Sequence, residues 1–221
     1  MGRKIMVIGL DGATFDVLRP LMKEGYLPNL RNLMLRGAAG SLRSVFPPVT
    51  GPAWLCLGTG LIPEQTGLYD FAAVQNSGYR LSRGIHSARY RGRAIWDYLS
   101  AAGKRVCVLA YPLLYPAYPI NGSMISGMGG LWEGQPTFPE DLKKEVHSLL
   151  KGEFRLVVRY HDPRYDDADL FLAHLKQSLS QKVRLAEYLL TRKEWDFFWL
   201  VFSESDWLQH RLWPAFDETH P

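Results

Sequence analysis

Residues 5–12 read Ile5-Met6-Val7-Ile8-Gly9-Leu10-Asp11-Gly12, and this stretch decides the fold class. Its apolar run is continuous, which is typical of a strand buried on both faces of a parallel sheet. Ligands of open α/β sheets bind beyond the carboxyl ends of the strands, and Asp11 stands at that position. Asp11 therefore either has a functional role or caps a helix that begins near Thr14.

Strand-like and helix-like segments alternate through the rest of the chain, which predicts an α/β fold with a mostly parallel sheet. We expect further strands at residues 41–45, 79–82, 105–110, 123–128, 154–160 and 196–202. We expect helices within 15–33, at 53–60, from 94 to about 99, at 139–151 and, most clearly, at 168–190. Residues 1–221 are predicted to form a single α/β domain with a loop-rich insertion near 61–92.

The composition indicates a protein with a sizeable core and a small-molecule partner. Of the 221 residues, 47% are hydrophobic and the formal net charge is +4 without a long basic block. We therefore expect no nucleic-acid polymer as partner, while a small anionic substrate is compatible with the charge. No apolar run reaches the roughly 18 residues of a membrane span, so we expect no membrane association. Cys56 and Cys107 are predicted to be buried thiols of a cytoplasmic protein.

A second informative stretch is Phe46-Pro47-Pro48-Val49-Thr50-Gly51-Pro52-Ala53-Trp54. Prolines stiffen the turn on both sides of Thr50, just before an apolar run that can begin a helix. The N–H groups at a helix N-terminus attract anions, so the Thr50 hydroxyl could face an anionic substrate. Alternatively, Thr50 is an ordinary helix cap in a proline-rich loop.

Asp206 and His210 form a third candidate element after the predicted strand at 196–202. Their spacing of four places both side chains on one face of a helix, where a carboxylate and an imidazole can bind zinc or another divalent ion. The alternative is a capping aspartate with a surface histidine. Because Asp11 and Asp206 both follow buried strands, we expect them, together with Thr50, to converge on one edge of the sheet.

In combination these motifs resemble the type I phosphodiesterase/nucleotide pyrophosphatase family of the alkaline phosphatase superfamily. The likeness extends over nearly the whole chain. It is carried by residues 7–12, 27–30, 47–54, 59–60, 67–71, 95–97, 115–116, 126–128, 201–206 and His210.

The resemblance implies a three-layer sandwich and a two-metal phosphoric ester hydrolase acting on a small phosphate ester or a nucleotide-like substrate. The metal is usually zinc, with manganese as the other candidate. Asp11 and Thr50 would bind one ion, and Asp206 and His210 the other. Thr50 would be the catalytic nucleophile, and the backbone N–H of Gly51 would stabilise a phosphoryl oxygen.

The chain also departs from the family pattern. Relatives carry a later Ser-Asp-His-Gly type motif and a further histidine that complete the two metal sites, whereas this sequence has no Asp-His dipeptide. It therefore resembles a truncated domain that is incomplete at the C-terminus. The alternative function is a catalytically incomplete module that keeps the fold and binds an anion or a partner chain. An open sheet edge predicts self-association.

Overall fold

The computed structural model describes residues 3–74, 81–83, 86–129, 134–215 and 217. Its main sheet has the strand order β1-β7-β4-β5-β6, in which β6 alone runs antiparallel to its neighbour. The strands are β1 (Ile5–Leu10), β4 (Val106–Tyr111), β5 (Gly122–Ser126), β6 (Thr137–Phe138) and β7 (Phe197–Phe202). The mostly parallel order agrees with the predicted α/β class.

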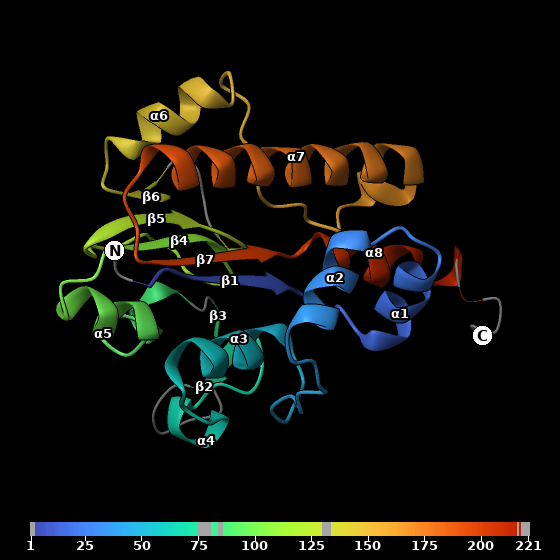
Figure 1. The fold of residues 1–221 in the computed structure, drawn as a ribbon, viewed down its shortest axis with the longest axis horizontal. Helices are drawn as coiled ribbons and strands as arrows, with labels where there is room; N and C mark the ends of the chain where they lie inside the picture. The colour runs from blue at the N-terminus through green and yellow to red at the C-terminus, as the bar shows by residue number, and fades with distance from the viewer. Residues whose placement is uncertain (1–2, 75–80, 84–85, 130–133, 216, 218–221) are drawn as a thin grey trace.

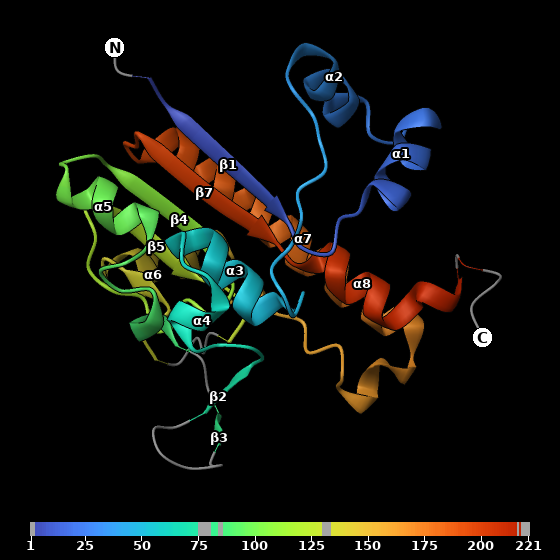
Figure 2. The same ribbon diagram turned by 90° about the horizontal axis from the view of Figure 1, so that it is seen from below.

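Helices cover the two faces of this sheet and form a three-layer sandwich (Figure 1). On one face lie α6 (Leu142–Leu149) and α7 (Ala168–Arg192), and on the other lie α3 (Thr50–Thr59), α4 (Pro63–Thr66) and α5 (Ile95–Ala101). Three more helices gather where β1 and β7 end: α1 (Phe15–Lys23), α2 (Pro28–Arg36) and α8 (Glu204–Leu212) (Figure 2). The carboxyl ends of β1 and β7 thus point toward α1 and α8.

The core is divided by the sheet into two main apolar clusters. Along β7, Trp199 and Val201 face α3 and α5, whereas Phe198 and Leu200 face α6 and α7. This alternation follows from the period of two in a strand. Because both faces are covered, β7 and β4 are buried as the sequence predicts for parallel strands.

The long helix and most of the strands lie where the sequence predicts them, but two predicted strands are wrong. Residues 41–45 run without regular structure along a cleft, and residues 154–160 pair with no strand. In the second segment, the Arg155 N–H donates to the Gln181 side chain and the Tyr160 carbonyl accepts from Arg211. Its apolar alternation therefore reflects packing against helices, with side chains replacing a strand as hydrogen-bond partners.

The prediction that β1 is buried on both faces is also wrong. Ile5 and Ile8 are 56% and 54% exposed, and Met6 and Leu10 are exposed as well. The physical reason is position, because within the described part of the chain β1 pairs only with β7 and forms the edge of the sheet. Neither α1 nor α2 covers this strand, since α1 buries only Met22 and α2 buries no residue.

The predicted loop-rich segment near 61–92 contains little regular structure. Besides α4, it holds a small antiparallel pair, β2 (Ala72–Val74) and β3 (Leu81–Arg83), and a short 3-10 helix, Ser87–Arg89. The strand predicted at 79–82 lies partly outside the described residues. Cys56 and Cys107 are free and buried, as expected. Within the described ranges, no helix is both long enough and apolar enough to cross a membrane.

Candidate active site

A cleft of about 820 Å³ opens at the carboxyl end of β1. Its walls come from the turn after β1, residues 42–45 and 48–49, the first helical turns of α3, and Asp206 of α8. Its size is within the range of about 300–1,000 Å³ that is common for small-molecule sites. Asp11, Thr50 and Asp206, which are 195 residues apart at most in the sequence, therefore line one cleft.

Asp11 is the most unusual side chain in the cleft. It is only 7% exposed, and its Oδ2 atom has no hydrogen-bond partner among the described residues. Burial and the nearby charge of Asp206 raise the pKa of Asp11 to about 6, against weaker opposing effects that include a hydrogen bond from Trp54. Asp11 caps no helix, because Thr14 is the N-cap of α1. A buried carboxylate oxygen without a partner is costly unless a cation or a proton accompanies it.

Thr50 is the first residue of α3, three residues before the predicted helix start. Val49 occupies the cap position, and its side chain makes no capping hydrogen bond, so the alternative of Thr50 as a cap is wrong. The first N–H groups of a helix lack intrahelical partners, and Pro52 has no N–H at all. The half-buried Thr50 hydroxyl and the N–H of buried Gly51 thus lie at a helix N-terminus that lines the cleft.

Trp54 joins α3 to the end of β1. Its indole donates a hydrogen bond to Asp11 and packs against Gly9, where a Cβ atom would lie 2.5 Å from the ring. The backbone carbonyl of Trp54 accepts a hydrogen bond from Tyr111 at 2.6 Å, which ties α3 to β4. Sequence reasoning missed this role, although the spacing of four from Thr50 places both residues on one helix face.

Asp206 and His210 lie on one face of α8, as their spacing predicts. The Nε2 atom of His210 is 3.4 Å from Oδ1 of Asp206, and Ser203 rather than Asp206 is the helix cap. Burial raises the pKa of Asp206, and the neighbouring His210 lowers it. Tyr160 stacks on the His210 ring with a centroid distance of 4.9 Å, a contact that the sequence did not reveal.

His210 does not line the cleft with the other three residues. Its imidazole lies in an adjoining hollow that also contacts Asp206. Two carboxylates, an imidazole and a hydroxyl are donors that suit a divalent cation, and the unpartnered Oδ2 of Asp11 fits such a ligand. In the described part of the chain, however, no three His, Cys, Asp or Glu side chains come close enough to hold one ion. The residues present therefore fit part of a metal site.

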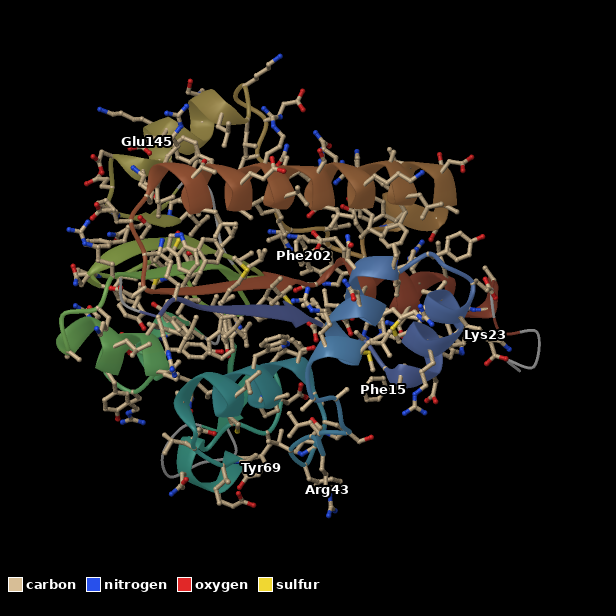
Figure 3. All side chains as sticks on the ribbon, viewed as in Figure 1. Phe15, Lys23, Arg43, Tyr69, Glu145 and Phe202 are labelled. Carbon is tan, nitrogen blue, oxygen red and sulfur yellow. The ribbon has the colours of Figure 1, made fainter. Side chains whose placement is uncertain are left out.

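The remaining wall of the cleft is mostly apolar. It includes Val45, Leu57 and Leu61, and Arg43 is the only basic side chain among the described lining residues. Figure 3 shows Arg43 on the loop below the carboxyl end of the sheet, where Phe202 is labelled. This arrangement suits a small anion that carries an apolar group.

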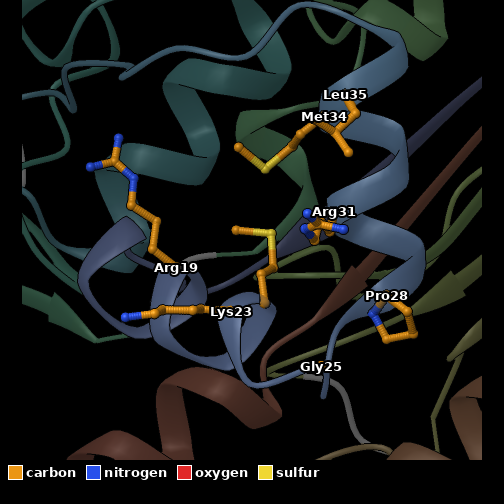
Figure 4. A pocket seen from close by; sticks show the side chains of 8 residues that line it. Arg19, Lys23, Gly25, Pro28, Arg31, Met34 and Leu35 are labelled. Carbon is orange, nitrogen blue, oxygen red and sulfur yellow. The ribbon is translucent and has the colours of Figure 1, made fainter.

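A separate hollow between α1 and α2 lacks the groups that catalysis requires (Figure 4). Arg19, Lys23 and Arg31 line it together with the thioethers of Met22 and Met34. None of its described lining residues is a carboxylate, an imidazole, a hydroxyl or a thiol. We therefore place the candidate active site in the cleft of Asp11, Thr50 and Asp206.

The fold defines a class of protein, the α/β sandwich with a ligand cleft at the carboxyl ends of its strands. Comparison with known proteins agrees with this class. The phosphonoacetate hydrolase of Sinorhizobium meliloti 1021, solved in complex with phosphonoacetate, superimposes with a TM-score of 0.60 at 16% identity. The match covers 92% of this chain and 47% of the hydrolase, so this chain spans about half the length of that protein. At this identity the likeness establishes the fold alone.

The type I phosphodiesterase / nucleotide pyrophosphatase family matches residues 5–221, and the chain belongs to this family. The resemblance read from the sequence is thereby confirmed. A comparison with curated protein sequences finds no significant match.

Proposed function

We propose that this chain is a metal-dependent phosphoric ester hydrolase of the phosphodiesterase or nucleotide pyrophosphatase type, with Thr50 as the nucleophile. One observation carries the proposal: the buried Asp11 has a carboxylate oxygen without a partner in the cleft that Thr50 lines from a helix N-terminus. A cation beside this carboxylate would offset the cost of its buried charge, and the helix N-terminus favours an anion. Family membership supports the same class of reaction.

The four donor residues divide between two cations, zinc or manganese. Asp11 and Thr50 would hold one, and Asp206 with His210 the other, which accords with the 3.4 Å between these last two side chains. When bound, the cations would lower the pKa of the Thr50 hydroxyl and balance the charge of the phosphoryl oxygens.

In the proposed reaction, Thr50 Oγ loses its proton to solvent and attacks phosphorus in line. The Oγ–P bond forms as the bond from phosphorus to the leaving alcohol breaks, and the alcohol oxygen takes a proton from water. The Gly51 N–H donates a hydrogen bond to a phosphoryl oxygen throughout. Water then cleaves the covalent threonine phosphodiester, which still carries the second ester group of the substrate; Oγ regains a proton and the phosphate monoester is released.

The cleft supports a small phosphate-ester or nucleotide-like substrate. Arg43 can attract the anionic group, and the apolar wall at Leu57 and Leu61 can contact an organic leaving group. The structural neighbour was solved in complex with a small phosphonate, phosphonoacetate.

Hydrolysis of an aryl phosphodiester tests this proposal. We expect turnover with added zinc or manganese and its loss with a chelator. Thr50→Ala should lower kcat on the order of 10³-fold or more, because the nucleophile is removed. Thr59→Ala removes a hydroxyl from the opposite end of α3 and should leave the rate nearly unchanged. Equal rates for Thr50→Ala and wild type would contradict the proposal.

A second candidate is a catalytically incomplete module that keeps the fold and binds an anion or a partner chain. It is favoured by the ligand number: the four donors give each ion two ligands, whereas typical zinc sites have three or four. Elemental analysis of the purified protein separates the two candidates. Bound metal with Thr50-dependent turnover supports the hydrolase, and anion binding without metal supports the module.

We further propose self-association through the open edge at β1. The apolar side chains of Ile5, Met6 and Ile8 are exposed there beside unpaired backbone groups. Light scattering should detect a dimer or a larger assembly, and a monomer at all concentrations would contradict the proposal.

The cysteines support a cytoplasmic location, which we also propose. Both thiols are free and buried, as is usual in a reducing compartment. Cell fractionation tests the location, and recovery in an oxidising compartment would contradict it.

A further inference from the structure

We propose that Ser205 and Gln209 are positioning residues that lock the Asp11-Gly12 turn against α8 and so fix the relative positions of Asp11 and Asp206, each of which would hold one of the two cations. The inference rests on the proposed function, since it concerns the same site. It assigns a role to two side chains that are not themselves metal donors in the scheme above.

The contacts join segments that are nearly 200 residues apart in the sequence. Ser205 Oγ donates a hydrogen bond to the Asp11 carbonyl at 2.6 Å, and the Asp11 N–H donates to the Phe202 carbonyl at 2.9 Å. Both backbone polar groups of Asp11 are therefore bound by the β7–α8 segment. The main chain of Asp11 cannot shift without breaking a hydrogen bond to the element that carries Asp206.

Gln209 holds the next residue of the turn. Its amide Nε2 donates to the Gly12 carbonyl at 2.9 Å and to the Ser205 carbonyl at 2.8 Å. Both N–H bonds of the amide are thus used, one on the turn and one on the helix. The second contact fixes the Gln209 side chain along α8, which orients the first.

The fit between the turn and α8 leaves no spare room. Gly12 has φ +70°, and a Cβ atom there would lie 2.9 Å from the Asp206 Cα. This backbone conformation and this contact both require glycine. The turn is therefore seated directly on the residue that carries the second carboxylate.

Helix α8 presents two side-chain pairs with the same spacing of four, offset by one residue. Asp206 lines both the cleft and the adjoining hollow, and His210 lines the hollow. Ser205 and Gln209 donate hydrogen bonds to the backbone carbonyls of the turn. Two carboxylates that are close together repel each other when no cation lies between them. The hydrogen bonds that Ser205 and Gln209 donate to the turn, which we call the clamp, oppose that repulsion. They also reduce the reorganisation needed when a cation binds.

Calorimetric titration of the metal-free protein with Mn²⁺ and Zn²⁺ tests the clamp. The variants are Ser205→Ala, Gln209→Met and the double variant, and Ser205→Thr keeps the hydroxyl. We expect the double variant to bind about 10–100-fold more weakly than wild type, as is typical when groups that orient metal ligands are removed. Ser205→Thr should restore most of the affinity that Ser205→Ala loses.

Gln177→Met is the matched control, because the Gln177 amide donates to Glu153 on an exposed surface away from the cleft. It should leave metal affinity unchanged. Urea unfolding of each variant without metal accompanies the titrations. Lower stability with unchanged metal affinity of the folded variants would show a purely structural role and overturn the inference.

A separate outcome identifies failure of the proposed function. If wild type binds neither metal, the proposed function fails and the clamp fails with it. If wild type binds metal, Asp11→Asn weakens binding, and the double variant still binds as wild type does, only the clamp is overturned. If the double variant does not unfold cooperatively, comparison of Ser205→Ala with Ser205→Thr decides the question.

Discussion

Strands β1 and β7 lie side by side in parallel and both lack polar and charged side chains, yet their surroundings differ. Ile8 is the register partner of Leu200, and the two side chains are 54% and 6% exposed. The difference comes from neighbours, because β7 lies between β1 and β4 whereas β1 has a partner on one side only. An apolar sequence thus indicates a strand suited to burial, and the fold around it decides whether burial occurs.

The buried carboxylates that follow the two strands, Glu204 after β7 and Asp11 after β1, differ in their polar partners. Glu204, after β7, is 5% exposed and binds Lys182 Nζ at 3.0 Å and Ser178 Oγ at 2.5 Å. Burial lowers the pKa of Lys182, while Glu204 raises it. Asp11, after β1, is equally buried but has an oxygen without a partner. The paired carboxylate stabilises the fold, and we assign the unpaired one to a ligand.

Breaking the paired carboxylate should have the largest effect on stability. Glu204→Ala leaves the Lys182 ammonium buried without its counter-ion, which should cost about 3–5 kcal/mol of unfolding free energy. Urea denaturation measures this. Because buried ion pairs can often be replaced by apolar residues, Lys182→Met combined with Glu204→Leu should recover most of the loss. A cost below about 1 kcal/mol for Glu204→Ala would show that the pair is hydrated in solution.

Alanine substitution of Ile8 and Leu200, the register partners in β1 and β7, tests the difference in burial between the two strands. Leu200→Ala should cost about 2–5 kcal/mol, because it leaves a cavity in the core. Ile8→Ala should change the unfolding free energy by less than about 0.5 kcal/mol at low protein concentration, as is usual for exposed positions. Equal costs would mean that β1 is covered in solution, and a dependence on concentration would assign the cover to a second copy.

Neutralising the unpaired carboxylate should stabilise the metal-free protein. Asp11→Asn removes a buried charge that repels Asp206, so in the presence of a chelator we expect an increase of about 1–3 kcal/mol in unfolding free energy. The same variant should gain less from added metal than wild type does, because only the site of Asp206 and His210 keeps its carboxylate. Wild type should gain about 2.7 kcal/mol when the free metal is a hundred times its dissociation constant. Destabilisation by Asp11→Asn would instead assign Asp11 a structural role.

Placing a charge on the open edge should have the smallest effect on the monomer. Ile8→Lys puts an ammonium on an exposed strand, which disfavours edge pairing. We expect the assembly seen by light scattering to dissociate, with a change below about 0.5 kcal/mol in monomer stability. An assembly that persists in this variant would show that another surface holds the copies together.

Much of the fold could be predicted from local patterns in the sequence. The apolar run of β7 and the repeat of α7 are strong signals, because their periods match buried elements. The strand prediction was wrong at residues 41–45 and 154–160. In the first segment the alternation of apolar residues reflects a position along the cleft, and in the second it reflects packing against helices. The prediction was also wrong for the exposure of β1, which depends on the strands beside it rather than on its own residues.

The candidate site could be predicted only in part. Asp11 and Asp206 follow strands whose carboxyl ends meet, and Thr50 begins a helix, so their shared cleft follows from topology. Their chemical roles stay predictions. Trp54, Ser205 and Gln209 were missed because their partners are backbone groups or side chains distant in the sequence.

We propose that Thr50 forms a covalent bond to the phosphorus of the substrate during turnover. The most direct measurement is acid quenching of the metal-loaded protein during hydrolysis of an aryl phosphodiester, followed by mass spectrometry of its peptides. We expect wild type to carry on Thr50 a phosphoryl group that keeps one ester group of the substrate, and the same peptide of Thr50→Ala to carry none. Turnover without modification of Thr50, or with modification at another residue, would contradict it.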